Sequence, residues 1–343
     1  MKVIILASGR GSRFHPLTTV LPKPLLPVAN RPLLEYLIAA LTEAGCSHIF
    51  VTVGYEAEQI QRFLTNLPCS ASLVPIFAPE WSKGPLHSLK AAIPHLSPQK
   101  PFLLVPADLY VSAQTLTSLI STQSELALLF DAERKLPGTQ IEVRASNQIY
   151  AITQNACALP KHSPVIPALR ATPEFLQWGL GTESTPPEVG PAASTVADLI
   201  SRWLLHEGSI QGIPITKQIW CDVDEPHQLV HLNHYLLSAG WPPAPMPPGT
   251  YLPEGTSMTG PLESATLSLG HETHIQGPVL LGTRVRVGDK CLIHGGTTLG
   301  ASTVVQDNSE LAHCITFPGT QVPLNVHLVG AILDAKGNII HSR

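Results

Sequence analysis

The stretch that decides the fold runs from Met1 to Val28 and reads MKVIILASGRGSRFHPLTTVLPKPLLPV. Its apolar run at residues 3–6 is too short to span a membrane and is typical of a buried strand. Gly9 and Gly11 in the following turn let the backbone bend sharply and present N–H groups to an anion. Arg13 and Lys23 then supply positive charge suited to phosphate groups. We therefore predict a strand followed by a phosphate-binding turn.

The glycine turn alone has an alternative interpretation. Turns of this kind after strands are common, so residues 9–13 would also fit an ordinary tight turn with an exposed Arg and Lys. They do not follow the P-loop pattern, and the dinucleotide fingerprint would require glycine where Phe14 stands. The longer string around the turn is therefore more informative than the turn itself.

Downstream, buried strands alternate with amphipathic helices. The patterns predict strands at 49–53, 71–77 and 102–105, and helices at 33–41, 56–64 and 88–93. Weaker patterns predict a strand at 126–130, a hairpin over 141–152, a loop at 182–195 and helices at 194–205 and after 226. This alternation favours a doubly wound, Rossmann-like α/β sheet that binds its ligand at the carboxyl ends of the strands.

Asp108 follows the strand at 102–105 directly. A carboxylate at the carboxyl end of a buried strand, in the same crevice as a phosphate-binding turn, is suited to hold Mg²⁺. An ordinary turn residue at the end of a strand is the alternative interpretation. The sequence thus gives Asp108 as a candidate metal ligand.

The N-terminal string resembles the signature of the sugar-phosphate nucleotidyltransferases, the nucleoside-diphosphate-sugar pyrophosphorylases. The resemblance covers residues 6–13, 16–18, 22–25 and 27–28. It implies that the turn wraps a nucleoside triphosphate and that Arg13 and Lys23 act with Asp108 in catalysis. The nucleotide-binding residues that it implies, together with those of a looser second glycine segment at 81–88, are Leu6, Ala7, Ser8, Gly9, Arg10, Gly11, Ser12, Arg13, Lys83, Gly84 and Asp108.

The family resemblance also suggests a second metal ligand. Residues 219–226, IWCDVDEP, resemble the segment that carries the second metal-binding Asp, and this role falls on Asp222. The family usually has Gly where Asp224 stands, so Asp224 is either a helix N-cap or a supplementary ligand. Alternatively, residues 222–225 simply cap the following helix. His87 in the second glycine segment fits a nucleotide neighbour and a surface residue equally well.

Two departures from the family pattern concern the substrate pocket. Ala107 replaces a glycine that usually precedes Asp108, which narrows the predicted nucleotide pocket. The Glu-Lys-Pro segment that holds the sugar phosphate in the family is replaced by Thr153-Gln154-Asn155-Ala156. Together with Asp224, these departures leave open a catalytically silent relative that serves as a regulatory or assembly subunit.

Composition limits the remaining possibilities. The chain has 343 residues, a net charge of −4 and no basic run, which argues against nucleic acid as a partner. It shows no secretory leader pattern and no long apolar run, so neither export nor membrane spanning is expected. Six scattered cysteines without a C-x-x-C pair predict free thiols in a reducing cytoplasm. We expect a soluble cytoplasmic protein.

The C-terminal part has a different period. An apolar residue recurs every sixth position, with Pro323 as the only break: Leu269, Ile275, Leu281, Val287, Ile293, Leu299, Val305, Leu311, Phe317 and Val329. This hexapeptide repeat predicts a parallel β-helix. It resembles the left-handed β-helix appended to many sugar nucleotidyltransferases. Residues 241–249 contain five prolines and mark a linker.

These patterns predict three segments, namely a nucleotidyltransferase domain at 1–240, a proline-rich linker at 241–250 and a left-handed β-helix at 251–343. The predicted reaction is the Mg²⁺-dependent transfer of a nucleotidyl group from a nucleoside triphosphate to a sugar 1-phosphate, with glucose 1-phosphate or mannose 1-phosphate favoured. The metal ligands are Asp108 and Asp222. The β-helix is expected to form a homo-oligomer. The alternatives are a regulatory site and acyl transfer by a histidine base, with His271, His274, His294 and His313 available.

Overall fold

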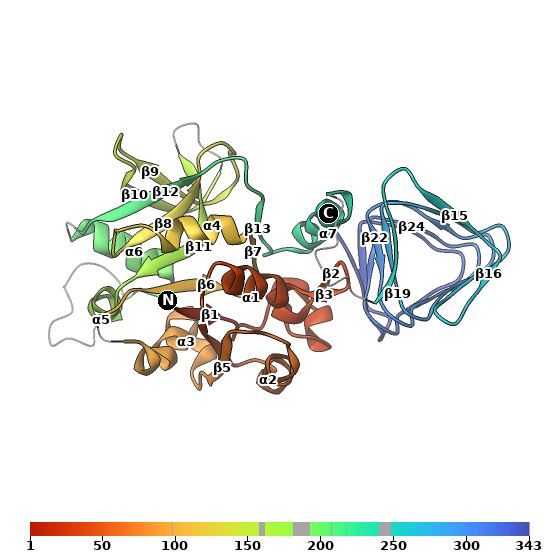
Figure 1. Cartoon of the computed structure of the whole chain (residues 1–343), viewed down its shortest axis with the longest axis horizontal. Coiled ribbons are helices and arrows are strands. Elements are labelled where there is room, and N and C mark those ends of the chain that lie inside the picture. The colour runs from red at the N-terminus through yellow and green to blue at the C-terminus, as the bar shows by residue number, and fades with distance from the viewer. Residues whose placement is uncertain (98, 158–161, 181–192, 207, 240–247, 343) are drawn as a thin grey trace. The chain divides into compact units, whose positions relative to one another are not determined.

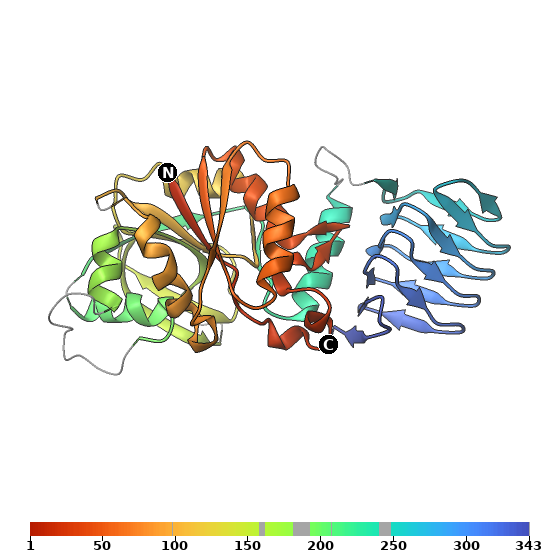
Figure 2. The ribbon, with the colours of Figure 1, turned by 90° about the horizontal axis from the view of Figure 1, so that it is seen from below.

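The computed structural model describes residues 1–97, 99–157, 162–180, 193–206, 208–239 and 248–342. They form two compact units, each built from two stretches of the chain and shown in Figures 1 and 2. The sheet unit comprises Met1–Arg10 and Leu34–Asp222, and the prism unit comprises Gly11–Leu33 and Val223–Arg343. The chain thus passes between the units three times, after Arg10, after Leu33 and after Asp222. The predicted linker falls mostly on 241–247, outside the described residues, and stays a prediction.

Four parallel strands make one half of a nine-stranded mixed sheet in the sheet unit. β1 (Lys2–Leu6) lies between β4 (His48–Val53) and β6 (Phe102–Pro106), and β5 (Ser72–Phe77) pairs with the far edge of β4. The residues of β1, β4 and β6 are mostly buried, as expected for parallel strands covered on both faces. The associated helices are α1 (Leu33–Glu43), α2 (Ala57–Asn66) and α3 (Pro85–Ala92). The predicted α/β fold is confirmed in this half.

The other half of the sheet is mainly antiparallel. β11 (Ser163–Ala171) joins it to β6, and the order continues through β8 (Ala127–Asp131), β12 (Ile210–Ile215), β10 (Gln148–Ala156) and β9 (Gly138–Val143). β9 and β10 form the predicted hairpin. The accompanying helices are α4 (Ala113–Ile120), α5 (Pro173–Leu180) and α6 (Val196–Leu205). Most of the predicted loop at 182–195 lies outside the described residues.

Several short elements lie outside the nine-stranded sheet and outside the three sheets of the prism. β7 (Leu109–Val111) pairs antiparallel with β13 (Trp220–Asp222), which is followed by helix α7 (Pro226–Ser238). β2 (Pro27–Val28) and β3 (Arg31–Pro32) form a small hairpin in the prism unit. Single turns of 3₁₀ helix lie at Ser12–Phe14, Leu17–Thr19, Lys23–Leu25, Trp81–Lys83 and Ile93–His95.

Three sheets form the prism. The first contains β14 (Gly249–Leu252), β19 (Val279–Gly282), β22 (Thr297–Leu299), β25 (Ile315–Thr316), β28 (Ala331–Leu333) and β29 (Ile339–His341). The second contains β15 (Ser257–Thr259), β18 (His274–Gln276), β21 (Leu292–Ile293), β24 (Glu310–Ala312) and β27 (His327–Val329). The third contains β16 (Leu262–Glu263), β17 (Leu267–Leu269), β20 (Val285–Val287), β23 (Val304–Val305) and β26 (Gln321–Val322).

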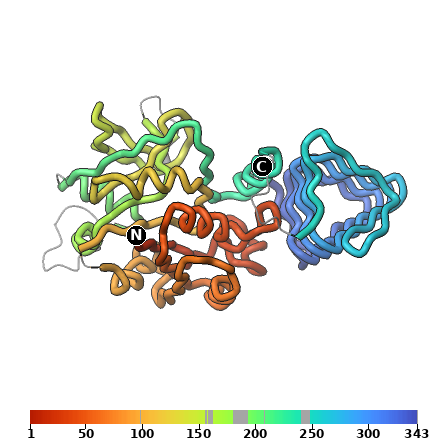
Figure 3. Tube along the Cα trace, viewed as in Figure 1, coloured from red at the N-terminus to blue at the C-terminus, as the bar shows by residue number. Residues whose placement is uncertain are grey.

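Within each of these sheets the inner strands pair in parallel, whereas β14, β15 and β16 pair antiparallel at the first edge and β29 pairs antiparallel at the last edge of the first sheet. The successive coils can be followed along the blue end of the trace in Figure 3. Apolar side chains from all three sheets share one core. The predicted parallel β-helix is therefore present, closed by antiparallel strands.

The hexapeptide register holds only through the first coils. The apolar residues at every sixth position from Leu269 to Leu311 are at most 3% exposed. Leu292 pairs with Glu310, 18 positions later, whereas Glu310 pairs with His327, 17 positions later. The second of these coils is therefore one residue shorter than the first. The prediction that Val329 points inward is wrong, because it is 53% exposed and Leu328, at 7%, takes its place. The same shift puts Val322 at the inward position where Pro323 seemed to break the repeat.

A buried amide joins three parts of the prism unit. Oδ1 of Asn233 on α7 accepts hydrogen bonds from the N–H of Ala29 (2.8 Å) and from Oγ1 of Thr298 (2.9 Å). Its Nδ2 donates to the carbonyl oxygen of Gly296 at 2.9 Å. Asn30, beside Ala29, donates from Nδ2 to the carbonyl of Leu299 at 3.1 Å. The segment at 11–33 is therefore tied directly to α7 and to the first sheet of the prism.

No helix among the described residues combines the length and the apolar character needed to cross a membrane.

Candidate active site

The first half of the glycine turn is fixed by the sheet unit. The N–H of Ala7 donates to the carbonyl of Thr52 (3.1 Å), and the N–H of Tyr55 donates to the carbonyl of Ser8 (3.0 Å). The hydroxyls of Ser8 and Ser88 share a hydrogen bond of 2.5 Å. A Cβ built on Gly9 would meet nothing within 4 Å, so the turn is open on that side. The backbone at Gly9 is thus accessible while its neighbours are held, which suits close approach by a ligand.

The second half of the turn belongs to the prism unit and needs glycine at position 11. Gly11 has φ +65°, and a Cβ there would lie 2.7 Å from Cβ of Lys23. Short 3₁₀ turns then place Phe14 in the core, with Nζ of Lys23 5.7 Å from the centre of its ring. The Lys23 side chain is 12% exposed, whereas that of Arg13 is 60% exposed. Lys23 is therefore held in place, and Arg13 extends into solvent.

Both cations contact the same carboxylate oxygen. Nη1 of Arg13 and Nζ of Lys23 each lie 3.1 Å from Oδ1 of Asp224. Asp224 is not the N-cap of α7, because that position is taken by Glu225, which forms a capping box with Gln228. The N-cap interpretation of Asp224 is therefore wrong. Its role as a supplementary metal ligand stays a prediction.

Asp108 and Asp222 come together through a short antiparallel pair of strands. Asp108 immediately precedes β7, and Asp222 ends β13 opposite Leu109. Their carboxylate oxygens lie within 4.8 Å of each other, and both side chains are half-buried. Two carboxylates this close repel unless a cation or a proton lies between them. An all-oxygen donor set of this kind fits Mg²⁺, which prefers carboxylate and phosphate ligands.

A buried carboxylate that the sequence did not reveal, Asp131, orients the strand of Asp222. Oδ2 of Asp131 accepts hydrogen bonds from Nε1 of Trp220 (2.8 Å) and from Nε of Arg134 (2.6 Å). Burial alone would raise the pKa of Asp131, but hydrogen bonds from Arg134, Trp220 and Glu133 hold that pKa below its usual value. The Arg134 guanidinium also lies 5.1 Å from the Trp220 ring centre. The start of β13 is therefore anchored to the end of β8.

The second glycine segment is attached to the turn after β4. Trp81 packs against Gly54 so closely that a Cβ on Gly54 would overlap the indole ring. Lys83 is exposed and forms an ion pair with the nearby Glu80. Gly84 has φ +120° and opens α3. Nucleotide binding by Lys83 and Gly84 stays a prediction. The surroundings of half-buried His87 do not decide between a nucleotide neighbour and a surface residue.

A polar network occupies the place of the Glu-Lys-Pro segment. Nε2 of Gln154 donates to Oδ1 of Asp198 at 2.6 Å, and Oδ2 of Asp198 accepts from both the N–H and the hydroxyl of Ser194. Burial alone would raise the pKa of Asp198, but hydrogen bonds from Ser194, Gln154 and Thr195 hold it far below its usual value. At this place the protein thus presents a stably ionised carboxylate instead of the lysine of the family pattern.

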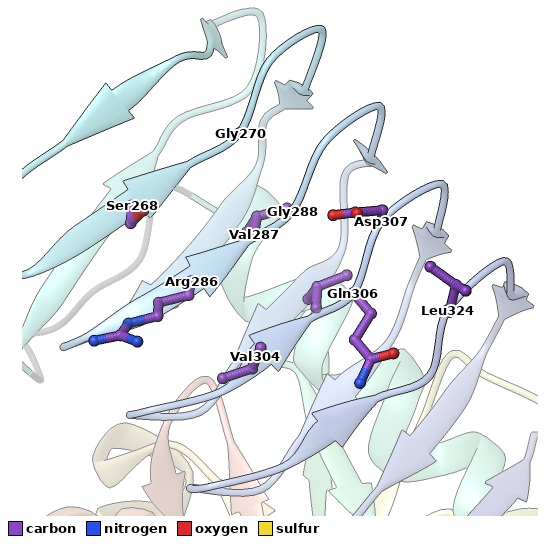
Figure 4. A pocket seen from close by; sticks show the side chains of 10 residues that line it. Ser268, Gly270, Arg286, Val287, Gly288, Val304, Gln306, Asp307 and Leu324 are labelled. Atoms are coloured by element: carbon purple, nitrogen blue, oxygen red, sulfur yellow. The ribbon is translucent and has the colours of Figure 1, made fainter.

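The prism has a groove of its own on the outer face of the third sheet, shown in Figure 4. It measures about 440 Å³ and is lined by Ser268, Gly270, Arg286, Val287, Gly288, Val304, Val305, Gln306, Asp307 and Leu324. The histidines considered for acyl transfer are not among these residues. Two of them have partners elsewhere: Nε2 of His294 lies 2.9 Å from Glu310, and the His313 ring packs on His234 at 4.8 Å.

Comparison with known proteins decides the family. The profile of the MobA-like NTP transferase domain matches residues 3–169, which include the glycine turn and Asp108. Residues 3–169 therefore belong to the MobA-like NTP transferase domain, and relatives that match nearly the whole chain are named as sugar-phosphate nucleotidyltransferases. The predicted family and enzyme class, a nucleotidyltransferase, are thereby confirmed.

Named relatives of this nucleotidyltransferase match it over different lengths. The mannose-1-phosphate guanylyltransferase catalytic subunit beta of Drosophila pseudoobscura pseudoobscura is 36% identical over 111 residues, covering 31% of this chain and 29% of that protein. The probable mannose-1-phosphate guanylyltransferase 2 of Arabidopsis thaliana is 24% identical over 333 residues, covering 94% of this chain and 83% of that protein. The bifunctional protein GlmU of Methanococcus maripaludis is 24% identical over 349 residues, covering 98% and 78%.

A solved structure supports the fold. UDP-glucose pyrophosphorylase from Acinetobacter baumanii superposes with a TM-score of 0.57 at 16% sequence identity, covering 70% of this chain and 94% of that one. At this level of identity the likeness extends to the architecture alone.

Proposed function

We propose that this nucleotidyltransferase transfers a nucleotidyl group from a nucleoside triphosphate to a sugar 1-phosphate. A phosphate oxygen of the sugar 1-phosphate attacks the α-phosphorus, the bond from the α-phosphorus to the bridging oxygen breaks, and pyrophosphate leaves. The observation that carries the proposal is the pairing of Asp108 with Asp222, whose oxygens lie within 4.8 Å at the end of a parallel strand. Such a pair is what a reaction between two anions needs.

The chain's own groups have separate tasks in this reaction. Arg13 and the N–H groups of the glycine turn hold the leaving pyrophosphate, and Lys23 steadies the α-phosphate or the incoming sugar phosphate. Asp108 and Asp222 would hold Mg²⁺, which, when bound, neutralises charge on the phosphoryl oxygens. The turn residues predicted to bind nucleotide, with Lys83 and Gly84, complete the proposed site.

The nature of the sugar remains part of the proposal. Two of the relatives are named mannose-1-phosphate guanylyltransferases, which favours mannose 1-phosphate. A further relative from Synechocystis, 40% identical over 66 residues, is named UTP–glucose-1-phosphate uridylyltransferase, which favours glucose 1-phosphate. The ionised Asp198, beside Gln154, favours an acceptor whose hydroxyl groups, rather than its phosphate, face this network.

The first experiment is a panel of four nucleoside triphosphates crossed with sugar 1-phosphates, measuring Mg²⁺-dependent pyrophosphate release. We expect turnover with one pair in the wild-type protein and nearly complete loss in Asp108→Asn. Glu58→Gln, which removes an exposed carboxylate from α2, is the matched control and keeps full turnover. A folded Asp108→Asn protein with normal turnover would contradict the assignment. Silence of the whole panel, with triphosphate binding retained, would favour the regulatory-subunit alternative.

We also propose a role and a setting for the prism. Coils made of three hexapeptide steps support a left-handed β-helix, and its flat outer faces suit contact with a second copy in a homo-oligomer. All six cysteines are free thiols, which supports a reducing cytoplasm. Light scattering on the purified chain tests the oligomer, and a monomer at all concentrations would refute it.

A further inference from the structure

The carboxylate of Asp224 already contacts the two cations to which the proposed function assigns phosphate binding. Its Oδ1 lies 3.1 Å from Nη1 of Arg13 and 3.1 Å from Nζ of Lys23. Hydrogen bonds from Arg and Lys to a carboxylate or to a phosphate use the same donors at the same distances. A phosphate oxygen that contacts both donors therefore needs the position that Oδ1 now occupies.

The position of Asp224 is set by its own helix rather than by the cations. Its N–H donates to Oε1 of Gln228 at 2.7 Å, and the N–H of Glu225 donates to the same oxygen at 2.8 Å. Gln228 is the N3 residue of α7, so the turn that carries Asp224 is part of the helix cap. Asp224 is thus held next to the cations at a high effective concentration, as a tethered ligand is.

The cation on the other side is equally well held. Lys23 is only 12% exposed, and its neighbours Phe14 and Gly11 leave it little room to move. A lysine side chain held in this way cannot follow its counter-ion, the Asp224 carboxylate, into solvent. When the carboxylate leaves, the ammonium group of Lys23 therefore stays in place.

We propose that Asp224 is a built-in competitor of the substrate phosphates. It holds Arg13 and Lys23 in the ligand-free protein and is displaced from them when a phosphate binds. The inference rests on the proposed function, because it takes these two cations as the phosphate site. It predicts that removing this carboxylate strengthens phosphate binding, whereas removing the neighbouring charge of Glu225 does not.

The test measures binding of inorganic pyrophosphate by calorimetry in buffer freed of divalent cations. Because the Arg13 and Asp224 side chains are 60% and 46% exposed, solvent screens the competition. We expect Asp224→Asn to bind pyrophosphate about three- to tenfold more tightly than the wild type, a difference of about 0.7–1.4 kcal/mol. Asp224→Ser, which cannot place an oxygen near the cations, should show the same gain.

Two further variants make the result specific. Glu225→Gln removes the same charge at the next position, and Glu225 caps α7 without any ion pair to Arg13 or Lys23 among the described residues. Its pyrophosphate affinity should match the wild type. In an Arg13→Gln background, Asp224→Asn should gain less than in the wild type, because one of the two contested donors is gone.

Three results would overturn the inference, and they are distinguishable. Unchanged or weaker pyrophosphate binding by both Asp224 variants, with binding by the wild type retained, would refute the competition alone. An equal gain in Glu225→Gln would show that only the overall charge matters. No pyrophosphate binding by the wild type or by any variant would refute the metal-free phosphate site at Arg13 and Lys23, on which the inference rests, whereas Mg²⁺-dependent pyrophosphate release tests the proposed function separately.

Discussion

Asn233→Leu should be among the most damaging single substitutions in the prism unit. The side chain is fully buried, and its amide satisfies the Ala29 N–H, the Thr298 hydroxyl and the Gly296 carbonyl. Leucine has a similar volume, so the change removes these hydrogen bonds without leaving a large cavity. The effect therefore measures the loss of polar partners rather than the loss of packing.

The magnitude follows from the groups left without a partner. Two buried main-chain groups, at Ala29 and Gly296, lose their hydrogen bond at about 1–3 kcal/mol each, while the Thr298 hydroxyl can rotate toward another acceptor. Burying the leucine side chain offsets about 1–2 kcal/mol of this. We expect a net loss of about 3 kcal/mol, which corresponds to a melting temperature lower by roughly 6–12 °C for a unit of this size.

The assay combines calorimetry with hydrogen exchange, because a chain of two units does not unfold in a single step. Peptides from 26–33, 226–238 and 296–299 should all exchange faster in Asn233→Leu, since one amide joins them. Asn66→Leu, which replaces an exposed asparagine at the end of α2, serves as the control and should change stability by less than about 0.5 kcal/mol. A melting temperature indistinguishable from that control, with unchanged exchange in these peptides, would refute the reasoning.

Two further predictions concern stability. Gly11→Ala should lower the free energy of unfolding by about 1–3 kcal/mol, because the residue has φ +65° and its new Cβ would approach Lys23. Gly9→Ala, whose Cβ meets nothing, should melt like the wild type. Equal melting temperatures for the two variants would contradict this prediction. Burial and the neighbouring His234 and His294 lower the pKa of His313, so the unfolded chain binds more protons below pH about 6.5 and stability falls as the pH drops from about 7.5 to about 5.5. His313→Gln should lose less stability over this range in thermal melts, His227→Gln should behave like the wild type, and an identical pH dependence in all three proteins would rule out His313 as the cause.

The elements that sequence patterns predicted well are those whose signal is local. The strands of the parallel half are continuous apolar runs because both of their faces are covered, and such runs are visible in the sequence. β11 was missed because Pro164 and Pro167 mask its strand pattern, and proline usually argues against a strand inside a sheet. The shortened step between β24 and β27 escaped notice because it leaves the apolar spacing intact up to Leu311.

In the candidate site, too, the residues within local motifs were predicted, whereas contacts between residues far apart in the sequence were not. The glycine turn, Arg13, Lys23 and Asp108 lie within recognisable motifs. The contact of Asp224 with Lys23 joins residues 201 positions apart, and that of Asp131 with Trp220 spans 89 positions. Pairings at such separation depend on the folded backbone and leave no spacing to recognise. The ion pair of Lys83 with Glu80 is the exception, since positions i and i+3 on a helical turn are neighbours.

The hydrogen bonds of Asn30 and Asn233 have a consequence for how this protein can be recombined. Exchange of the prism at the proline-rich stretch would look harmless in an alignment, yet it would replace the partners at 296–299 while keeping both asparagines. A foreign prism would then leave polar groups buried beside the segment that carries Arg13 and Lys23. The prism and the segment at 11–33 are thus expected to be inherited together, although nearly the whole sheet unit separates them in the gene.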